Sequence, residues 1–151
     1  MPAQPATGSR RVMRSVLGVL VAVLAVYAGW KLLAPPPPEI DVSYNTVSAD
    51  GLYQVMFETD VEPVPVGETH SWVLSLTTPE GAPVSDATIL IDGGMPAHGH
   101  GLPTAPQVSE NLGEGRYRIE GMRFNMGGHW EIRIAISAPP GDDSAVFNLE
   151  L

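Results

Sequence analysis

The fold of this chain is constrained most strongly by a period of two in its apolar residues, which persists from Ile40 to Leu151. Successive side chains of a β-strand point to opposite faces, so this period predicts strands with one buried and one exposed face. The apolar positions that alternate in this way are Tyr53, Val55 and Phe57; Trp72, Leu74 and Leu76; Ile89 and Ile91; Tyr117 and Ile119; Trp130, Ile132, Ile134 and Ile136; and Ala145, Phe147, Leu149 and Leu151. This part of the chain is therefore expected to form strands and not helices.

Turn-forming sequences separate these runs, at residues 64–67 (Val-Pro-Val-Gly), 79–81 (Pro-Glu-Gly), 113–115 (Gly-Glu-Gly) and 139–142 (Pro-Pro-Gly-Asp). With a first strand expected at residues 40–47, the pattern predicts about seven short strands. Strands of that number and spacing, in a domain of about 110 residues, are typical of an all-β, immunoglobulin-like antiparallel β-sandwich.

The N-terminal part of the sequence has a different character. Residues 15–34 carry one charge, that of Lys31, and are otherwise rich in Val, Leu and Ala. A helix of about 20 apolar residues spans a bilayer, and a Lys near its end can keep the ammonium group at the interface. Tyr27 and Trp30 lie where an aromatic belt is expected. The sequence therefore predicts one transmembrane helix over residues 15–34.

The charges beside this segment predict its orientation. Three arginines precede it, Arg10, Arg11 and Arg14, and no basic residue follows it closely. The excess of positive charge on the cytoplasmic side of membrane proteins places the tail, residues 1–14, in the cytoplasm. The domain, residues 40–151, is then expected on the extracytoplasmic, periplasmic side of a bacterial cytoplasmic (inner) membrane, as part of a single-pass protein.

Two further features of this region bear on the topology. Residues 35–39 contain four consecutive prolines, which end a helix and form a stiff linker to the domain. The alternative to an anchor is a signal peptide cleaved near Val26-Tyr27-Ala28. We favour the anchor, because the apolar run exceeds the roughly 7–15 residues usual in signal peptides. Either alternative leaves the domain outside the cytoplasm.

The predicted domain is strongly acidic and lacks cysteine. From Glu39 onward the sequence has 17 acidic and four basic residues, a net charge of −13. Such a domain has no basic surface for a phosphate backbone, so no nucleic-acid partner is expected. The absence of Cys excludes disulfides, thiol catalysis and metal sites that require a thiolate.

Methionine and histidine gather in two segments. The first, residues 93–101 (Gly-Gly-Met-Pro-Ala-His-Gly-His-Gly), follows the strand expected to end near Ile91. Residues two apart in extended chain point the same way, so His98 and His100 can face one centre. The neighbouring glycines leave space and let the backbone bend around an ion. Met95, three residues upstream across a proline, can turn to the same side, which makes these three the first candidate metal ligands.

The second segment, residues 122–130, runs from a possible strand end to the Trp130 strand. It supplies Met122, Met126 and His129 as candidates to complete a metal shell. The competing interpretation is structural, because Met on a strand commonly fills a core and His129 could simply begin a strand. His70 stands alone at the start of another expected strand, which favours a structural role for it.

The chemistry of these side chains favours copper. Thioether and imidazole are soft to intermediate ligands, so they select copper over magnesium, calcium or manganese. Thioethers favour Cu(I), while imidazole accommodates Cu(II) and also zinc. The sequence leaves the oxidation state and the choice between copper and zinc open.

Two sequence stretches resemble a known family. Met-Pro-Ala-His-Gly-His-Gly at residues 95–101, followed by Gly-Arg-Tyr-Arg-Ile-Glu-Gly-Met-Arg-Phe-Asn-Met-Gly-Gly-His-Trp-Glu-Ile at residues 115–132, is similar to the YtkA-like/FixH-like domains. The resemblance implies an extracytoplasmic immunoglobulin-like β-sandwich, often tethered to a membrane. It also implies a role in copper handling and in the assembly of copper respiratory oxidases. Many members have Met where this chain has His98 or His100, and an extra residue precedes Trp130, so the metal's identity is left open.

Three classes of function follow from these observations. The first is a membrane-anchored copper-binding module that delivers copper, with a membrane oxidase or a copper transporter as its partner. The second is a non-metal scaffold or assembly domain that contacts a membrane complex. The third, an enzyme, is not expected, because no Ser-His-Asp or Cys-His arrangement occurs and the carboxylate nearest to the His segment is Asp92.

Overall fold

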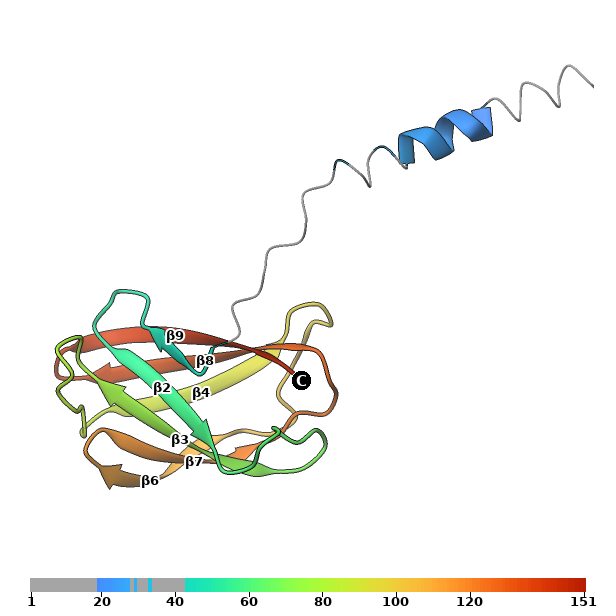
Figure 1. Cartoon of the computed structure of the whole chain (residues 1–151). Coiled ribbons are helices and arrows are strands. Elements are labelled where there is room, and N and C mark those ends of the chain that lie inside the picture. The colour runs from blue at the N-terminus through green and yellow to red at the C-terminus, as the bar shows by residue number, and fades with distance from the viewer. Residues whose placement is uncertain (1–18, 28, 30–32, 34–42) are drawn as a thin grey trace, which may run out of the picture. The chain divides into compact units, whose positions relative to one another are not determined.

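The computed structural model describes residues 19–27, 29, 33 and 43–151 (Figure 1). The contacts divide the chain into two units, Met1–Glu39 and Ile40–Leu151. In the first unit the described residues are helical. Within them, no helix has the length and apolar character that a membrane crossing requires. The predicted tail, the predicted linker and nine of the 20 residues of the predicted anchor lie outside the described residues, so the transmembrane helix stays a prediction.

The second unit is a β-sandwich of two antiparallel sheets (Figure 1). One sheet has the strand order β1 (Asn45–Val47), β2 (Gln54–Thr59), β3 (His70–Thr77), β7 (Arg116–Met122) and β6 (Gln107–Gly113). The other has the order β5 (His100–Gly101), β4 (Thr88–Met95), β8 (His129–Ala138) and β9 (Gly141–Glu150). The predicted all-β sandwich is confirmed.

The hydrophobic core lies between the two sheets, where the period of two in the sequence places it. Along β3 and β8 every second residue is buried, beginning with His70 and Trp130 respectively. The largest side chains at the centre include Phe57 and Trp72, whose rings stack with centroids 4.1 Å apart. Each large apolar side chain that is fully buried contributes about 1.5–3 kcal/mol relative to exposure, so this inner layer supplies most of the stabilisation.

The structure has two strands that the apolar pattern does not predict, β5 and β6. Strand β6 lies at the edge of its sheet, with most of its side chains exposed or half-buried, and its pairing with β7 shifts register twice. An edge strand with so little buried surface has no need of alternating apolar residues, which explains why the pattern misses it. Strand β4 also continues to Met95, beyond the end expected near Ile91.

This extension of β4 depends on two glycines. A Cβ on Gly93 would lie 2.7 Å from Ile132 Cδ1, and a Cβ on Gly94 would lie 2.8 Å from the His100 carbonyl oxygen. Side chains at these positions would collide with the neighbouring strands. The Gly-Gly sequence therefore lets β4 approach β5 and β8 closely and carries the chain to the Met/His segment at the end of the sandwich.

Candidate metal site

A tight hairpin joins β4 to β5 and presents the first group of candidate ligands. Met95 and His100 are directly opposite partners in the β4–β5 pairing. The amides of His98 and Gly99 both donate hydrogen bonds to the Met95 carbonyl oxygen, at 3.1 and 2.9 Å. Gly99 has a φ of 67°, in the left-handed region that glycine adopts without strain. These bonds fix the four residues between Met95 and His100 as a closed turn.

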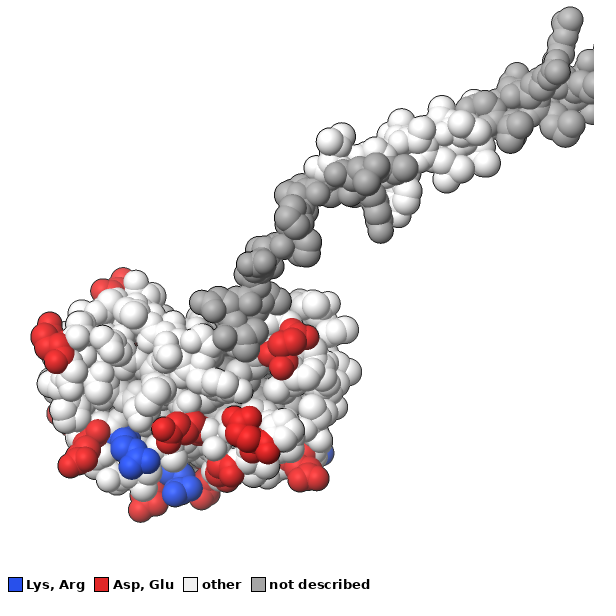
Figure 2. Space-filling model, viewed as in Figure 1, with Lys and Arg blue, Asp and Glu red and all other residues white. Residues whose placement is uncertain are grey.

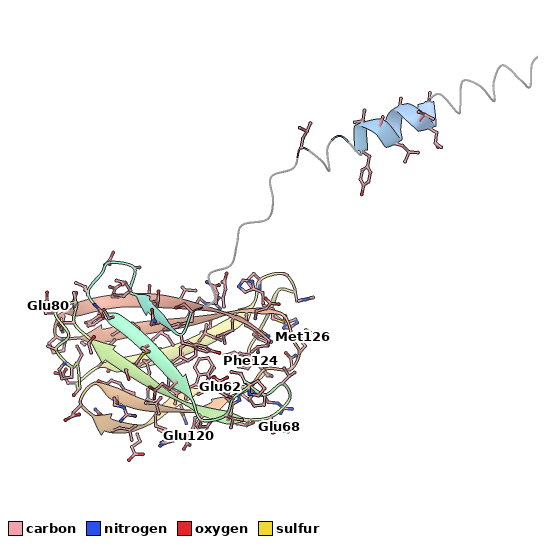
Figure 3. The ribbon with its side chains drawn as sticks, in the orientation of Figure 1. Glu62, Glu68, Glu80, Glu120, Phe124 and Met126 are labelled. Atoms are coloured by element: carbon pink, nitrogen blue, oxygen red, sulfur yellow. The ribbon has the colours of Figure 1, made fainter. Side chains whose placement is uncertain are left out.

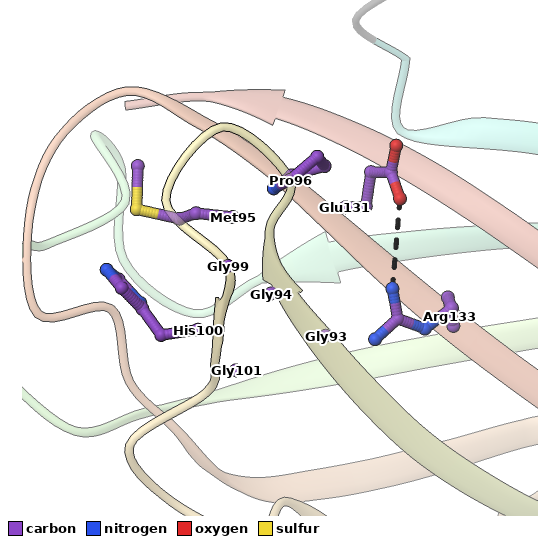
Figure 4. A pocket seen from close by; sticks show the side chains of 9 residues that line it. All are labelled: Gly93, Gly94, Met95, Pro96, Gly99, His100, Gly101, Glu131 and Arg133. Carbon is purple, nitrogen blue, oxygen red and sulfur yellow. Dashed lines mark ion pairs between the residues drawn. The ribbon is translucent and has the colours of Figure 1, made fainter.

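The pairing brings the Met95 thioether and the His100 imidazole to the same side of the hairpin. Directly opposite residues of an antiparallel pair project from the same face, with their Cβ atoms about 5 Å apart. Figure 4 shows both side chains pointing away from Glu131 and Arg133. Met95 is 3% exposed, whereas His100 is exposed to solvent. The pair therefore combines a buried thioether with an accessible imidazole.

His98 lies beside His100 on the solvent side of the same turn. The two imidazole rings have centroids 5.8 Å apart and an interplanar angle of 26°. Both side chains are exposed, and within the described residues neither ring takes part in a hydrogen bond. Their ring nitrogens are therefore available to a ligand from solution. The three candidates of the first segment lie together, although His98 lies in a turn and not in the extended chain that the spacing argument assumes.

His129 lies apart from this group. It begins β8, where the next residue, Trp130, faces the core, so His129 faces outward from the sheet. Its Nε2 is 2.9 Å from the Asn148 Oδ1 on β9, within hydrogen-bond distance. The structure thus gives His129 a neighbour within its own sheet, on the opposite face from Met95.

Met122 is a core residue of the other sheet. It is completely buried and pairs with His70 across β3 and β7. His70 is itself 6% exposed, and its ring lies 5.7 Å from that of Phe124. Met122 therefore occupies the position that its structural interpretation predicts, and the structure gives it a neighbouring imidazole that is not one of the six candidate ligands.

Met126 lies on the turn between β7 and β8, at the margin of the sandwich (Figure 3). It is 39% exposed, and its carbonyl oxygen accepts a hydrogen bond of 3.1 Å from the Trp130 indole. The same turn passes beside the first group, because a Cβ on Gly128 would lie 3.1 Å from the Met95 Cε. Met126 is thus on a segment that contacts Met95, although its own side chain is turned to solvent.

A hollow of about 330 Å³ opens beside the hairpin (Figure 4). Five of its lining residues are Gly or Pro of the hairpin, and Glu131 and Arg133 of β8 form another wall. Arg133 pairs with Glu131 at 3.7 Å and with Asp92 at 2.9 Å. The bond from Arg133, with one from the Gly93 amide, lowers the pKa of the Asp92 carboxyl. The charge of the Arg133 guanidinium is therefore neutralised by the carboxylates of Asp92 and Glu131.

The wider surface of the domain is acidic. Figure 2 shows carboxylates distributed over the visible face of the domain, with few basic side chains between them. A surface of one sign attracts ions of the other, so the domain as a whole attracts cations.

The donor set of the hairpin suits a soft metal ion. Among the described residues, no group of three or more His, Asp or Glu side chains could hold a metal. A three-ligand site on this hairpin would instead combine the imidazoles of His98 and His100 with the thioether of Met95. Nitrogen and thioether ligands of this kind fit copper, and the imidazoles also accept zinc.

One residue of this site is missing from the six candidates. The indole of Trp130 is completely buried, and its centroid lies 6.2 Å from that of His100. The Trp130 ring also contacts Phe124 edge to face, with ring centroids 5.1 Å apart. Trp130 belongs to the clearest alternating run, so the sequence signals its burial but not its proximity to a hairpin 30 residues earlier.

Comparison with known proteins identifies the family of this domain. No curated protein sequence matches the chain. A solved structure, described as the ZirS C-terminal domain, aligns with 78% of this chain and 83% of its own length, at 14% sequence identity and a TM-score of 0.37. The family model described as YtkA-like matches residues 49–135, which include β2 to β7, both Met/His segments and most of β8. The chain belongs to the YtkA-like family.

Proposed function

We propose that this protein is a membrane-anchored, extracytoplasmic copper-binding module whose metal site is the β4–β5 hairpin. The observation that carries the proposal is the cross-strand pairing of Met95 with His100, with the His98 ring 5.8 Å from that of His100. The ligands come from one rigid turn, so little conformational entropy is lost when they converge on an ion.

The ligand chemistry supports copper over other biological cations. A thioether is a poor ligand for magnesium, calcium or manganese and a good one for Cu(I). Imidazole binds Cu(II) and zinc as well, so zinc is the competing metal. Met95 distinguishes the two, because a site that depends on the thioether favours copper.

The accessibility of the site supports a role in delivery. Both imidazoles are exposed, and the hairpin lies at the end of the sandwich. A copper ion held there by few protein ligands keeps open positions for the ligands of a receiving protein. We propose a membrane oxidase under assembly, or a copper transporter, as the partner, in keeping with the family resemblance and the predicted anchor over residues 15–34. In this role the chain binds and transfers an ion and is not an enzyme.

Metal titration tests the proposal directly. The full-length chain, held in mild detergent, is titrated with Cu(I) under anaerobic conditions and separately with Cu(II) and Zn(II), against a chelator of known affinity. Trp130 lies close enough to His100 for bound copper to quench its fluorescence, which gives a second readout. We expect copper to bind with a dissociation constant below about 1 µM, equivalent to about −8 kcal/mol.

Two variants locate the site. Replacement of His100 by Ala is expected to weaken copper binding at least about tenfold, which corresponds to about 1.4 kcal/mol. His129→Asn is the matched control, since this histidine lies on the other face and is expected to leave the affinity unchanged. Binding that is absent in the unaltered chain, or unaffected by His100→Ala, would refute the proposal and favour the scaffold alternative.

A further inference from the structure

We propose that the hairpin contains two overlapping ligand pairs that share His100 and serve different oxidation states of copper. Met95 and His100 form the pair for Cu(I), and His98 and His100 form the pair for Cu(II). This inference depends on the proposed function, because it assumes that the hairpin binds copper. It adds which side chains hold each ion.

The burial of Met95 makes its pair suitable for the monovalent ion. The side chain is 3% exposed and lies against the Gly128 turn, at the end of the core. The penalty for moving an ion out of water rises steeply with its charge, so a half-buried position favours Cu⁺ over Cu²⁺. The thioether is also the soft ligand of the set, and soft ligands select Cu(I).

The exposure of His98 makes the second pair suitable for the divalent ion. Its ring lies 5.8 Å from that of His100, and both side chains are exposed. Cu(II) prefers a tetragonal arrangement of nitrogen and oxygen ligands. Two exposed imidazoles can supply the nitrogens while water completes the coordination, without removing the ion from solvent.

The geometry of the turn keeps the two pairs distinct. Met95 faces His100 across the strands, whereas His98 lies in the turn whose amide is bonded to the Met95 carbonyl oxygen. The Met95 side chain is on the core side, and the His98 side chain is on the solvent side. His100 lies between them and is the residue that each pair requires.

Parallel titrations of the full-length chain with Cu(I) and Cu(II) test this division. Met95→Leu, which nearly preserves volume, is expected to weaken Cu(I) binding at least about tenfold and Cu(II) binding less than about threefold. His98→Asn is expected to do the reverse. His100→Ala should weaken both, and His129→Asn neither. A thermal melt of each variant, compared with that of the unaltered chain, confirms that the fold is retained.

Electron paramagnetic resonance of the Cu(II) form gives an independent readout. The hyperfine pattern is expected to show two nitrogen ligands in the unaltered chain and in Met95→Leu, but one in His98→Asn. If Met95→Leu and His98→Asn weaken both ions equally, the hairpin is a single three-ligand site and this inference is wrong, while the proposed function stands. If the unaltered chain binds neither ion, the proposed function itself fails.

Discussion

The phenolic hydroxyl of Tyr117 donates a hydrogen bond to the Val84 carbonyl oxygen at 2.7 Å, deep between the two sheets. The Tyr117 hydroxyl oxygen in turn accepts a hydrogen bond of 3.0 Å from the Ala87 amide. Tyr117 lies on β7, whereas Val84 and Ala87 precede β4 in the other sheet, so one side chain connects the two layers at the entry to the strand that carries the site.

Removal of this hydroxyl should therefore destabilise the domain. Tyr117→Phe leaves a buried carbonyl and a half-buried amide without their partner, and an unsatisfied buried polar group costs about 1–3 kcal/mol. We expect the free energy of unfolding to fall by about that amount in denaturant titrations. Tyr44→Phe is the matched control, because Tyr44 is 44% exposed and contacts Phe57 by its ring. An equal loss in both variants would contradict the role of the Tyr117 bonds.

The Asp143 carboxylate predicts how stability responds to acid. It accepts hydrogen bonds from the amides of Asp50 at 3.1 Å, Leu52 at 3.2 Å and Ser144 at 2.7 Å. Desolvation raises the pKa of this carboxyl, but the bonds from the Ser48 side chain and the three amides outweigh it and lower the pKa to about 2. The folded state thus favours the charged form, which ties β9 to the turn before β2.

The sign of the pH effect follows from this lowered pKa. An unfolded Asp titrates near about 3.9, so the stabilisation is complete above that pH and is lost as pH falls towards about 2. We expect Asp143→Asn to lower the melting temperature at neutral pH. The difference in melting temperature between this variant and the unaltered chain, here called the gap, should close between about pH 4 and pH 2. Asp92, whose pKa is also lowered, is present in both proteins and cancels in the comparison. A gap that stays constant over this range would contradict the prediction.

How far the sequence predicts the fold depends on whether a residue is buried. Trp72 and Trp130 lie on alternating apolar runs, and both are core residues of the strands expected for them. Strand β6 could not be predicted in this way, because it has one half-buried apolar face and bulges that break the period. Edge strands are held by backbone bonds to one neighbour, and backbone bonds leave no trace in the pattern of side chains.

The sequence predicts the part of the candidate site whose residues are close together in the chain. It does not predict the part that the packing of distant strands brings together. Met95, His98 and His100 lie within six residues, so one turn brings them together. His129 is remote in sequence from these three residues. Its neighbour Trp130 is clearly a core residue, so the alternation of buried and exposed positions along β8 could have shown that His129 faces outward. The proximity of Trp130 to His100 comes from the pairing of β4 with both β5 and β8, which a single sequence does not reveal.

The Gly94 position tests whether the close approach of β4 and β5 maintains the site. Gly94→Ala places a methyl group 2.8 Å from the His100 carbonyl oxygen, so the paired strands must separate. Overpacking of this kind costs about 1–3 kcal/mol. We expect the Leu102 amide, which donates to the Gly93 carbonyl oxygen at 3.0 Å, to exchange its hydrogen faster.

Gly51→Ala is the matched control for Gly94→Ala. Gly51 has a φ of 75° with open space around it, so Ala there introduces backbone strain of about 1–2 kcal/mol without a collision. Its effect on Leu102 exchange should be no larger than the global loss of stability explains. Unchanged Leu102 exchange in Gly94→Ala would show that the hairpin does not depend on this contact.

The predicted anchor over residues 15–34 has a direct test in cells. We expect the full-length chain to sediment with membranes and to remain there after alkaline carbonate washing, since about 20 apolar residues bind a bilayer in an effectively irreversible way. A chain that begins at residue 39 without a leader should be recovered in the soluble fraction. If the mature full-length chain is released in shortened form, the signal-peptide alternative is correct.

Replacement of His70 is predicted to stabilise the domain, because this residue carries a buried polar atom that has no hydrogen-bond partner in the core. Its Nε2 and the Trp72 Nε1 are buried and have no hydrogen-bond partner among the described residues. The other ring nitrogen is 3.4 Å from the Glu68 carbonyl oxygen, at the limit of a hydrogen bond. His70→Phe keeps an aromatic ring against Phe124 and removes the unsatisfied nitrogen.

We therefore expect His70→Phe to raise the free energy of unfolding by about 1 kcal/mol, at the lower end of the 1–3 kcal/mol that an unpaired buried group costs. His70→Asn is the comparison variant, and it should lower the stability because it is polar and leaves a cavity beside Met122. Denaturant titration of both variants measures the difference. A clear loss of stability in His70→Phe would contradict the prediction. It would show that the contact with the Glu68 carbonyl oxygen, or a bound water on Nε2, contributes more than the unpaired nitrogen costs.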